Sequence, residues 1–413
     1  MLIGLDLGTT AIKGVLTDIS GDIVAEAITE TALRTPQPGW VEIDPDQHYE
    51  SVCQVIRQLA DSAGGEVTAL AMAAASGNTL LTDAQGAPLG PIISWMDSRS
   101  SGIDMAASEL ARITGWPCID SFPLAHLSWL QEHEPELYHS AGHVGMDTDW
   151  LLFRLTGLWR LDYSSATPFH LVDQVARKYH KTLLERLEIP EAKLSTLTHS
   201  GAFIGSLTEQ AAEDTGLSAE TMIVAGSFDH PAAARAAGVT APGQLMLSCG
   251  TSWVGFLPHA DRDAILDAEL LCDPFLSADG GPWAGMFSLP QIGRTIDWYM
   301  NKVGGKATFN ALADGADSAG LTIDLREPRR MPDANFARIA RAVMEGAARL
   351  LREKILELNG HGMTFERAVM VGGASRSSVW PGIVADITGL EISVAGRAAG
   401  ARGAAMIAKG KTL

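Results

Sequence analysis

Residues 2–17 read LIGLDLGTTAIKGVLT, and this stretch decides the fold. The apolar run over residues 2–7 is typical of a buried strand, and a Gly-Thr-Thr turn at residues 8–10 separates it from a second apolar run. A further turn at residues 21–22 precedes a third run, IVAEAITET, at residues 23–31. The pattern predicts that the chain opens with three sequential antiparallel strands.

A second copy of this pattern begins near the middle of the chain. Residues 244–258, QLMLSCGTSWVGFLP, again show strand, Gly-Thr turn and strand in that order. At 413 residues the chain is also longer than one hydrophobic core usually organises. We therefore predict two similar domains, residues 1–240 and residues 241–413.

The stretches between these units alternate between strand-like and helix-like periodicity, which indicates an α/β fold. Strands are expected at residues 67–75, 221–228 and 368–371, and helices at residues 46–63, 102–114, 124–137, 147–156, 231–238, 336–360 and 379–389. Asp147 and Asp149 are expected only to cap the helix at 147–156.

Composition excludes several classes of partner. The 49 acidic residues outnumber the 31 basic ones, and the formal net charge of −18 would repel nucleic acid and anionic membranes. No apolar run approaches the roughly 18 residues of a membrane span, and the four cysteines form no CxxC pair. We expect no nucleic-acid or membrane partner, no disulfide framework and a cytoplasmic location.

The two glycine turns have the chemistry of a phosphate site. Gly8 allows a sharp turn whose N–H groups, with the hydroxyls of Thr9 and Thr10, can bind phosphate oxygens. Asp6 can hold Mg²⁺ through water, and Lys13 adds a positive charge at the same place. The corresponding residues of the second copy are Gly250, Thr251 and Ser252. One such turn alone could be an ordinary hairpin, but the pair indicates a clamp around a nucleotide.

Two further junctions between a strand and a helix are candidates. The turn Gly372, Gly373, Ala374 and Ser375 could receive a base or ribose against bare backbone, or it could serve packing only. Asp229, in AGSFDHPAAAR, could accept the proton of a substrate hydroxyl during phosphoryl transfer. The alternative for Asp229 is a helix N-cap.

Taken together, these residues resemble the FGGY family of carbohydrate kinases over nearly the whole chain. The matching segments are LIGLDLGTTAIKGVLTD, PGWVEIDPDQHY, PLGPIISWMDSR, LLFRLTGLWRLDYSSAT, VAGSFDHPAAA, LSCGTS, VMVGGASRSSVWPGIVADITGLEISV and GARGAAMIA. The resemblance implies two actin-like (ribonuclease H-like) α/β domains of the sugar kinase/Hsp70/actin superfamily, with ATP and Mg²⁺ in the cleft between them. It implies that Asp229 is the catalytic base and that a small carbohydrate or polyol is the substrate.

The resemblance also points to substrate-binding residues. They are Ser76, Gly77, Asn78, Trp95, Asp97 and His230. Where xylulokinases carry a Met-His pair, this chain has Ser76 and Gly77, so pentuloses, hexonates and polyols all stay open, with ketopentoses such as xylulose mildly favoured. Asp97 has an alternative role in a structural ion pair with Arg99, and His126 stands where the family often has lysine.

Two other functions share these features. A catalytically silent sensor would keep the fold and the cleft, and a chaperone-like ATPase of the actin and Hsp70 type would act on polypeptides. The first has little reason to keep an acidic base beside both phosphate turns, and the second lacks a peptide-binding domain in this chain. The sequence is compatible with a homodimer.

Overall fold

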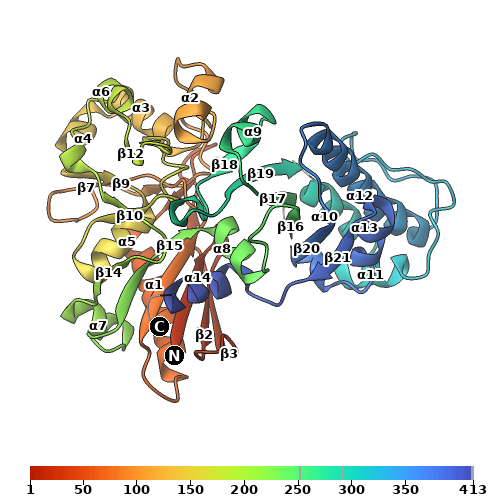
Figure 1. The fold of residues 1–413 in the computed structure, drawn as a ribbon, viewed down its shortest axis with the longest axis horizontal. Helices are drawn as coiled ribbons and strands as arrows, with labels where there is room; N and C mark the ends of the chain where they lie inside the picture. The colour runs from red at the N-terminus through yellow and green to blue at the C-terminus, as the bar shows by residue number, and fades with distance from the viewer. Residues whose placement is uncertain (251–252, 290–291, 411–413) are drawn as a thin grey trace. The chain divides into compact units, whose positions relative to one another are not determined.

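The structure is a computed structural model that describes residues 1–250, 253–289 and 292–410. The chain divides into two compact units, one formed by residues 1–236 with 400–413 and the other by residues 237–399. Within the described residues, each unit contains a mixed six-stranded sheet (Figure 1).

The sheet of the first unit has the order β14-β15-β6-β1-β2-β3. Its strands are β1 (Leu2–Leu7), β2 (Ala11–Thr17), β3 (Ile23–Glu30), β6 (Ala69–Ala74), β14 (Phe203–Ser206) and β15 (Met222–Phe228). Antiparallel pairing of β1 with β2 and of β2 with β3 confirms the predicted opening. Since β1, β6 and β15 are parallel, their C-terminal ends meet at one edge of the sheet, where the candidate residues follow.

Helices and small sheets complete the first unit. The helices are α1 (Pro45–Asp61), α2 (Ala107–Thr114), α3 (Pro123–His133), α4 (Pro135–Ser140), α5 (Asp147–Thr156), α6 (Lys181–Arg186), α7 (Glu209–Thr215), α8 (Asp229–Ala236) and α14 (Ala399–Lys409). The short strands are β4 (Leu33–Arg34), β5 (Glu42–Ile43), β7 (Leu80–Thr82), β8 (Ile92–Ile93), β9 (His143–Gly145), β10 (Arg160–Asp162), β11 (Val172–Asp173), β12 (Lys178–Tyr179) and β13 (Thr196–Thr198).

Two predicted helices differ from the helices in the structure. The helix expected over residues 102–114 begins only at Ala107. The helix expected over residues 124–137 is two helices, α3 and α4, because Pro135 disfavours the helical conformation of the residue before it.

The second unit repeats the plan of the first. Its sheet has the order β18-β19-β17-β16-β20-β21. The strands are β16 (Gln244–Cys249), β17 (Trp253–His259), β18 (Leu271–Asp273), β19 (Trp283–Leu289), β20 (Arg367–Gly372) and β21 (Glu391–Val394), and the helices are α9 (Arg262–Asp267), α10 (Ile292–Lys302), α11 (Lys306–Ala313), α12 (Phe336–Gly360) and α13 (Trp380–Thr388). The pairing senses along β19-β17-β16-β20-β21 match those along β3-β2-β1-β6-β15, so the predicted restart of the fold is real.

The division differs from the predicted boundary at residue 240 in two respects. The first unit ends at residue 236, and the chain returns to it at Gly400, whereas we expected the C-terminal segment in the second. Small residues explain the return of the chain, because a Cβ atom on Gly4 would lie 2.0 Å from the carbonyl oxygen of Ala401. The blue helix α14 accordingly runs beside the red strands in Figure 1. Only glycine allows backbone to approach backbone so closely.

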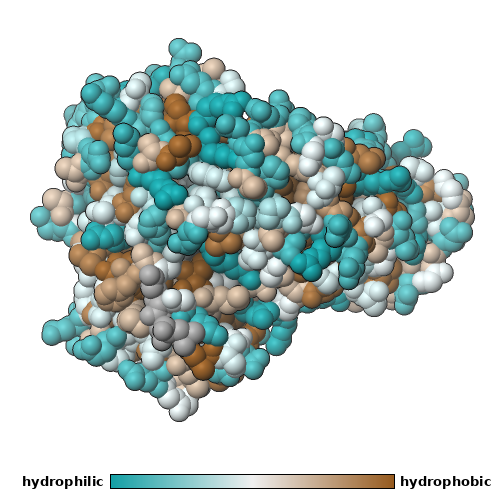
Figure 2. All heavy atoms as spheres, viewed as in Figure 1, coloured by the Kyte–Doolittle hydropathy of each residue, from teal (hydrophilic) through white to brown (hydrophobic). Residues whose placement is uncertain are grey.

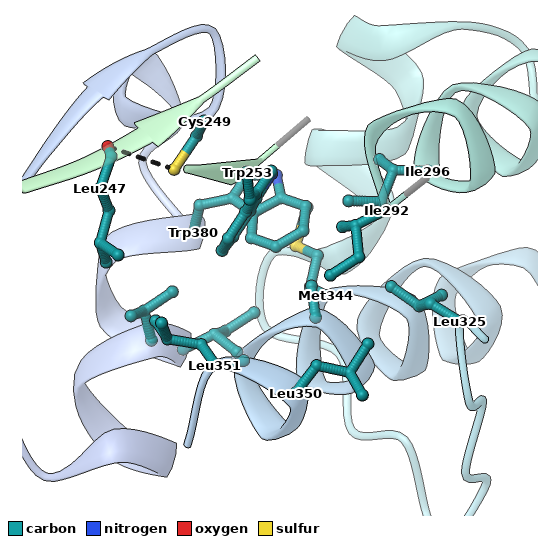
Figure 3. Packing of buried hydrophobic residues seen from close by; sticks show 14 of the residues in the cluster. Leu247, Cys249, Trp253, Ile292, Ile296, Leu325, Met344, Leu350, Leu351 and Trp380 are labelled. Atoms are coloured by element: carbon teal, nitrogen blue, oxygen red, sulfur yellow. Dashed lines mark hydrogen bonds between the residues drawn. The ribbon is translucent and has the colours of Figure 1, made fainter. Parts of the chain in front are cut away.

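Each unit has a hydrophobic core of its own. In the second unit, Trp253 of β17 and Trp380 of α13 pack with ring centroids 5.3 Å apart, above Met344 and Leu351 of α12 (Figure 3). In the first unit, α1 and α5 pack on the sheet, and a second cluster joins the segments from α2 to α6. These cores hold the ends of the central strands in place.

The face of the molecule drawn in Figure 2 is mainly polar. Teal and pale residues cover most of the face drawn in Figure 2, with brown residues interspersed among them. Among the helices of the described residues, none combines the length and apolar character needed to cross a bilayer.

Candidate active site

The turn between β1 and β2 is a tight loop at the C-terminal edge of the first sheet. The N–H of Gly8 donates to the carbonyl of Ala11 at 3.1 Å, and the hydroxyl of Thr31 donates to the carbonyl of Gly8 at 3.0 Å. A Cβ atom on residue 8 would lie 2.9 Å from the carbonyl oxygen of Ala11, so the turn requires glycine. Thr10 at its tip is exposed. The turn can therefore present hydroxyls to a ligand.

Asp6 lies beside this turn at the end of β1. It pairs across the hairpin with Lys13, whose Nζ lies 3.8 Å from Asp6 Oδ2. Burial raises the pKa of Asp6 to about 6, against the attraction of Lys13. Gly400 of α14 packs directly on the carboxyl group, since a Cβ there would lie 2.8 Å from Asp6 Cγ. The structure thus encloses a carboxylate next to the turn.

Asp229 and His230 stand at the same edge, where β15 runs into α8. The ring Nδ1 of His230 and its backbone N–H both donate to Asp229 Oδ1 at 2.6 Å. The side chains are 27% and 20% exposed, so solvent or a ligand can reach both. The charge of Asp229 also raises the pKa of Asp6. The fold therefore brings together the turn between β1 and β2, the acidic residue beside it and the candidate base, although Asp229 is more than 200 residues from the other two in the sequence.

A divalent cation is compatible with this group. Among the described residues, no set of three His, Cys, Asp or Glu side chains could hold a metal ion. Mg²⁺ does not need such a set, because it keeps several waters and takes its remaining ligands from one or two carboxylates and from phosphates. The carboxyl of Asp6 beside a phosphate turn fits that requirement.

The predicted substrate residues divide into two groups. Ser76 is buried, and its hydroxyl has no hydrogen-bond partner among the described residues, so it could bind a substrate hydroxyl. Gly77 has a φ of +116°, and the ring of Phe122 would lie 2.4 Å from any Cβ at that position. Asn78 and Trp95, in contrast, make hydrogen bonds within the protein and line a small cavity behind the turn.

Asp97 has the geometry of the alternative role. Its side chain is 0% exposed and accepts hydrogen bonds from the N–H of Val41 and from the guanidinium of Arg99. Arg99 also bonds to Glu42 and lies over the ring of Trp40. Burial alone would raise the pKa of Asp97, but these hydrogen bonds hold it below its usual value. The arrangement favours a structural ion pair.

His126 provides no positive charge in place of the lysine common in the family. It is fully buried on α3, and its Nδ1 lies 2.9 Å from the hydroxyl of Thr79. Burial lowers its pKa to about 4, so the ring is neutral at physiological pH.

The second unit brings its two predicted segments to one edge of its sheet. Cys249 and Gly372 are neighbours in the parallel pair β16 and β20, and the N–H of Gly373 donates to the carbonyl of Cys249 at 3.0 Å. Gly250 follows β16 directly, whereas Thr251 and Ser252 lie outside the described residues. In the turn after β20, Gly372 has a φ of +87° and accepts a hydrogen bond from Ser375 at 2.8 Å.

Sequence reasoning missed Lys306 and His48 near these turns, and it gave Asp147 only a capping role. Lys306 is the first residue of α11, and its ammonium nitrogen lies close to Gly373. A Cβ atom on Gly373 would be 3.1 Å from this nitrogen. His48 and Asp147 line the cavity behind the first turn and are almost fully buried. Asp149 accepts from the N–H of Met146 at the start of α5, as predicted. Asp147 also lies in the first turn of α5, and its carboxylate accepts a further hydrogen bond from Asn78.

Comparisons with known proteins agree with this arrangement. Family models for the FGGY family of carbohydrate kinases match residues 1–235 (N-terminal domain) and residues 309–409 (C-terminal domain). The xylulose kinase of Escherichia coli (strain K12) is 28% identical, with 99% of this chain and 90% of that protein covered. The autoinducer-2 kinase of Salmonella typhimurium is 26% identical, with 95% of this chain and 82% of that protein covered. The crystal structure of xylulose kinase from Rhodospirillum rubrum superposes with a TM-score of 0.86 at 25% identity, covering 98% of this chain and 89% of that one.

The solved sugar kinases also share the fold, since the gluconate kinase of Lactobacillus acidophilus superposes with a TM-score of 0.85. The predicted fold class, two actin-like domains, is therefore confirmed. With both family models matched across the two units, the chain belongs to the FGGY family of carbohydrate kinases.

Proposed function

We propose that this carbohydrate kinase transfers the γ-phosphoryl group of ATP to a hydroxyl of a ketopentose, with xylulose favoured over hexonates and polyols. The observation that carries the proposal is the grouping of Asp229, Asp6 and the glycine turn at one edge of the first sheet. Xylulose kinases among the relatives cover nearly the whole chain, which supports the ketopentose. Ser76 and Gly77 differ from the Met-His pair of xylulokinases, so other sugars and polyols are included in the test.

In this proposal Asp229 is the general base. The substrate oxygen forms a bond to the γ-phosphorus, the bond from that phosphorus to the bridging oxygen breaks, and ADP leaves. The proton of the hydroxyl passes to the carboxylate of Asp229. His230 holds Asp229 Oδ1 by its two N–H donors, so we expect Oδ2 to face the substrate.

Asp6 is the residue that would hold Mg²⁺ in this proposal. The ion, when bound, supplies charge neutralisation for the phosphate oxygens. Lys13 and the hydroxyls of Thr9 and Thr10 would bind the same phosphates. In the second unit, we assign nucleotide binding to Gly250, to the Thr251 and Ser252 positions and to the turn from Gly372 to Ser375.

The experiment is a substrate screen with the purified full chain, ATP and Mg²⁺. Xylulose, ribulose, gluconate, glycerol and other sugars are each tested for ADP release, with Asp229→Ala as the blank. We expect a ketopentose to have the highest kcat/KM. No sugar-dependent ADP release above the blank would reject the kinase, and binding of a sugar without turnover would favour a silent sensor. Release of ADP stimulated by unfolded polypeptide would favour a chaperone-like ATPase, although the relatives described above are kinases.

A further inference from the structure

Trp95 contacts the phosphate turn directly. Its indole Nε1–H donates a hydrogen bond to the hydroxyl oxygen of Thr9 at 3.0 Å. An indole nitrogen can only donate, so the Thr9 oxygen must act as the acceptor in this bond. The single proton of the Thr9 hydroxyl is therefore left to point at a different acceptor.

A buried chain of hydrogen bonds holds Trp95 in turn. The backbone N–H of Trp95 donates to Asn78 Oδ1 at 3.0 Å, and Asn78 Nδ2 donates to Asp147 Oδ2 at 2.7 Å. His48 Nε2 lies 3.7 Å from the same oxygen of Asp147. Asn78, Asp147 and His48 are 6%, 3% and 5% exposed, so water does not compete for these bonds.

The residues of this hydrogen-bond chain line a small cavity together with the turn. Its lining includes Gly8, Thr9, His48, Asn78, Trp95 and Asp147. The ring of Trp95 also packs at 6.4 Å from the ring of Phe122, which limits its movement on the side of the substrate residues. Both amide atoms of Asn78 are engaged within the protein, as is the indole N–H of Trp95.

We propose that Trp95 is a positioning residue for phosphoryl transfer. It orients the Thr9 hydroxyl so that its proton points at a phosphate oxygen of ATP, and Asn78 with Asp147 positions Trp95. The proposal rests on the proposed function, and it reassigns Trp95 and Asn78 from sugar contact to support of the phosphate turn. A hydroxyl already held in place loses less conformational entropy when it binds the phosphate, so its contribution to ATP affinity is greater.

The test is a double-mutant cycle between Trp95→Phe and Thr9→Val. Phenylalanine keeps an aromatic ring but removes the indole donor, and valine removes the hydroxyl with little change of shape. We measure the Kd for ATP·Mg²⁺, the KM for ATP, the KM for the sugar and the Tm. Trp95→Phe is expected to weaken ATP binding roughly fivefold to tenfold and to leave the KM for the sugar within about twofold, since the lost hydrogen bond to the neutral Thr9 hydroxyl contributes on this order. When Thr9 is already valine, Trp95→Phe is expected to cause no further loss of ATP affinity.

Trp150→Phe is the matched control. The indole N–H of Trp150 donates to the carbonyl of Gly86, also at 3.0 Å, and the side chain is fully buried away from the turn. This variant is expected to lower the Tm without weakening ATP binding.

Three outcomes would overturn the inference. They are unchanged ATP affinity in Trp95→Phe, additive losses in the double variant, and a rise confined to the KM for the sugar, which would return Trp95 to substrate contact. If no sugar is phosphorylated by the wild-type chain, the proposed function fails, and the ATP-binding cycle still decides the role of Trp95.

Discussion

The ring Nδ1 of His230 lies 2.6 Å from Oδ1 of Asp229, at the point where β15 ends and α8 begins. The backbone N–H of His230 reaches the same oxygen at the same distance. One oxygen of the carboxylate is therefore fixed by two donors from the next residue. This relationship orients the other oxygen, which is what a general base requires.

Replacing Asp229 with alanine tests that role. We expect kcat to fall by roughly a hundredfold or more, since a general base contributes about that much, while the Kd for ATP changes little. Steady-state kinetics and calorimetric titration with ATP measure the two quantities. If turnover persists and only the Tm falls, Asp229 is only an N-terminal cap of α8 and not a general base.

Replacing Asp6 with asparagine is expected to change both kinase activity and the free energy of unfolding. Its pKa is raised to about 6 by burial, so at neutral pH the folded state carries a charge that the fold disfavours. Because one pKa unit corresponds to about 1.4 kcal/mol, Asp6→Asn is expected to increase the free energy of unfolding by up to about 3 kcal/mol at pH 8. The same variant is expected to lose kinase activity, since asparagine provides no charge for Mg²⁺.

The pH dependence of Asp6→Asn has a definite sign. Well below pH 3.8, the ordinary pKa of an aspartate, the unfolded and folded forms of the wild type both carry protonated Asp6, so the substitution does not change the free energy of unfolding there. The gain develops as the pH rises from about 4 to about 6 and stays constant above that. Denaturant unfolding at pH 4 and pH 8 measures it. Equal gains at both values would show that the charge of Asp6 is not the cause. In the wild type, kcat/KM is expected to decline below about pH 6.

Asp97→Asn separates the two roles of Asp97. Breaking a buried ion pair by removing one charge usually costs about 3–5 kcal/mol, and both Asp97 and Arg99 are almost fully buried. We expect a loss of that order in denaturant unfolding, with no change in the KM for the sugar at a temperature where the variant is folded. Asp324→Asn is the control, because its ion pair with Arg326 is exposed and should contribute little. A raised KM with unchanged stability would instead make Asp97 a substrate ligand.

Gly403→Ala tests how α14 supports the base. A Cβ on Gly403 would lie 1.8 Å from the carbonyl oxygen of Ala232 in α8, the helix that begins at Asp229. We expect a loss of about 1–3 kcal/mol in the free energy of unfolding, as for other overpacked sites, together with a lower kcat. Gly382→Ala in α13 is the matched control, because no atom lies within 4 Å of its added Cβ and the change should be neutral or stabilising. Equal effects of the two substitutions would mean that α14 does not pack as the structure shows.

Local pattern was sufficient for the repeated core of the fold. Alternation of apolar runs with glycine turns placed β1, β2 and β3 within a residue or so of their observed bounds, and it identified the second copy at β16 and β17. Strand length and tight turns depend on residues that are neighbours in the sequence, so they can be predicted from the sequence alone. The glycine turns and Asp229 were predicted as site residues for the same reason, since each stands where a strand pattern stops.

The partners of the polar side chains were decided only by the tertiary structure. Asn78 and Asp147 are 69 residues apart and meet beneath the turn, so one pattern could not reveal that Asp147 serves Asn78 while Asp149 caps α5. The return of α14 to the first unit likewise depends on close backbone contacts at glycines, such as Gly4 against Ala401, and these contacts exist only after the sheet has formed. Hydrophobic periodicity indicates which face of a helix or strand is buried. The order of the strands in space decides which side chains on those buried faces contact one another.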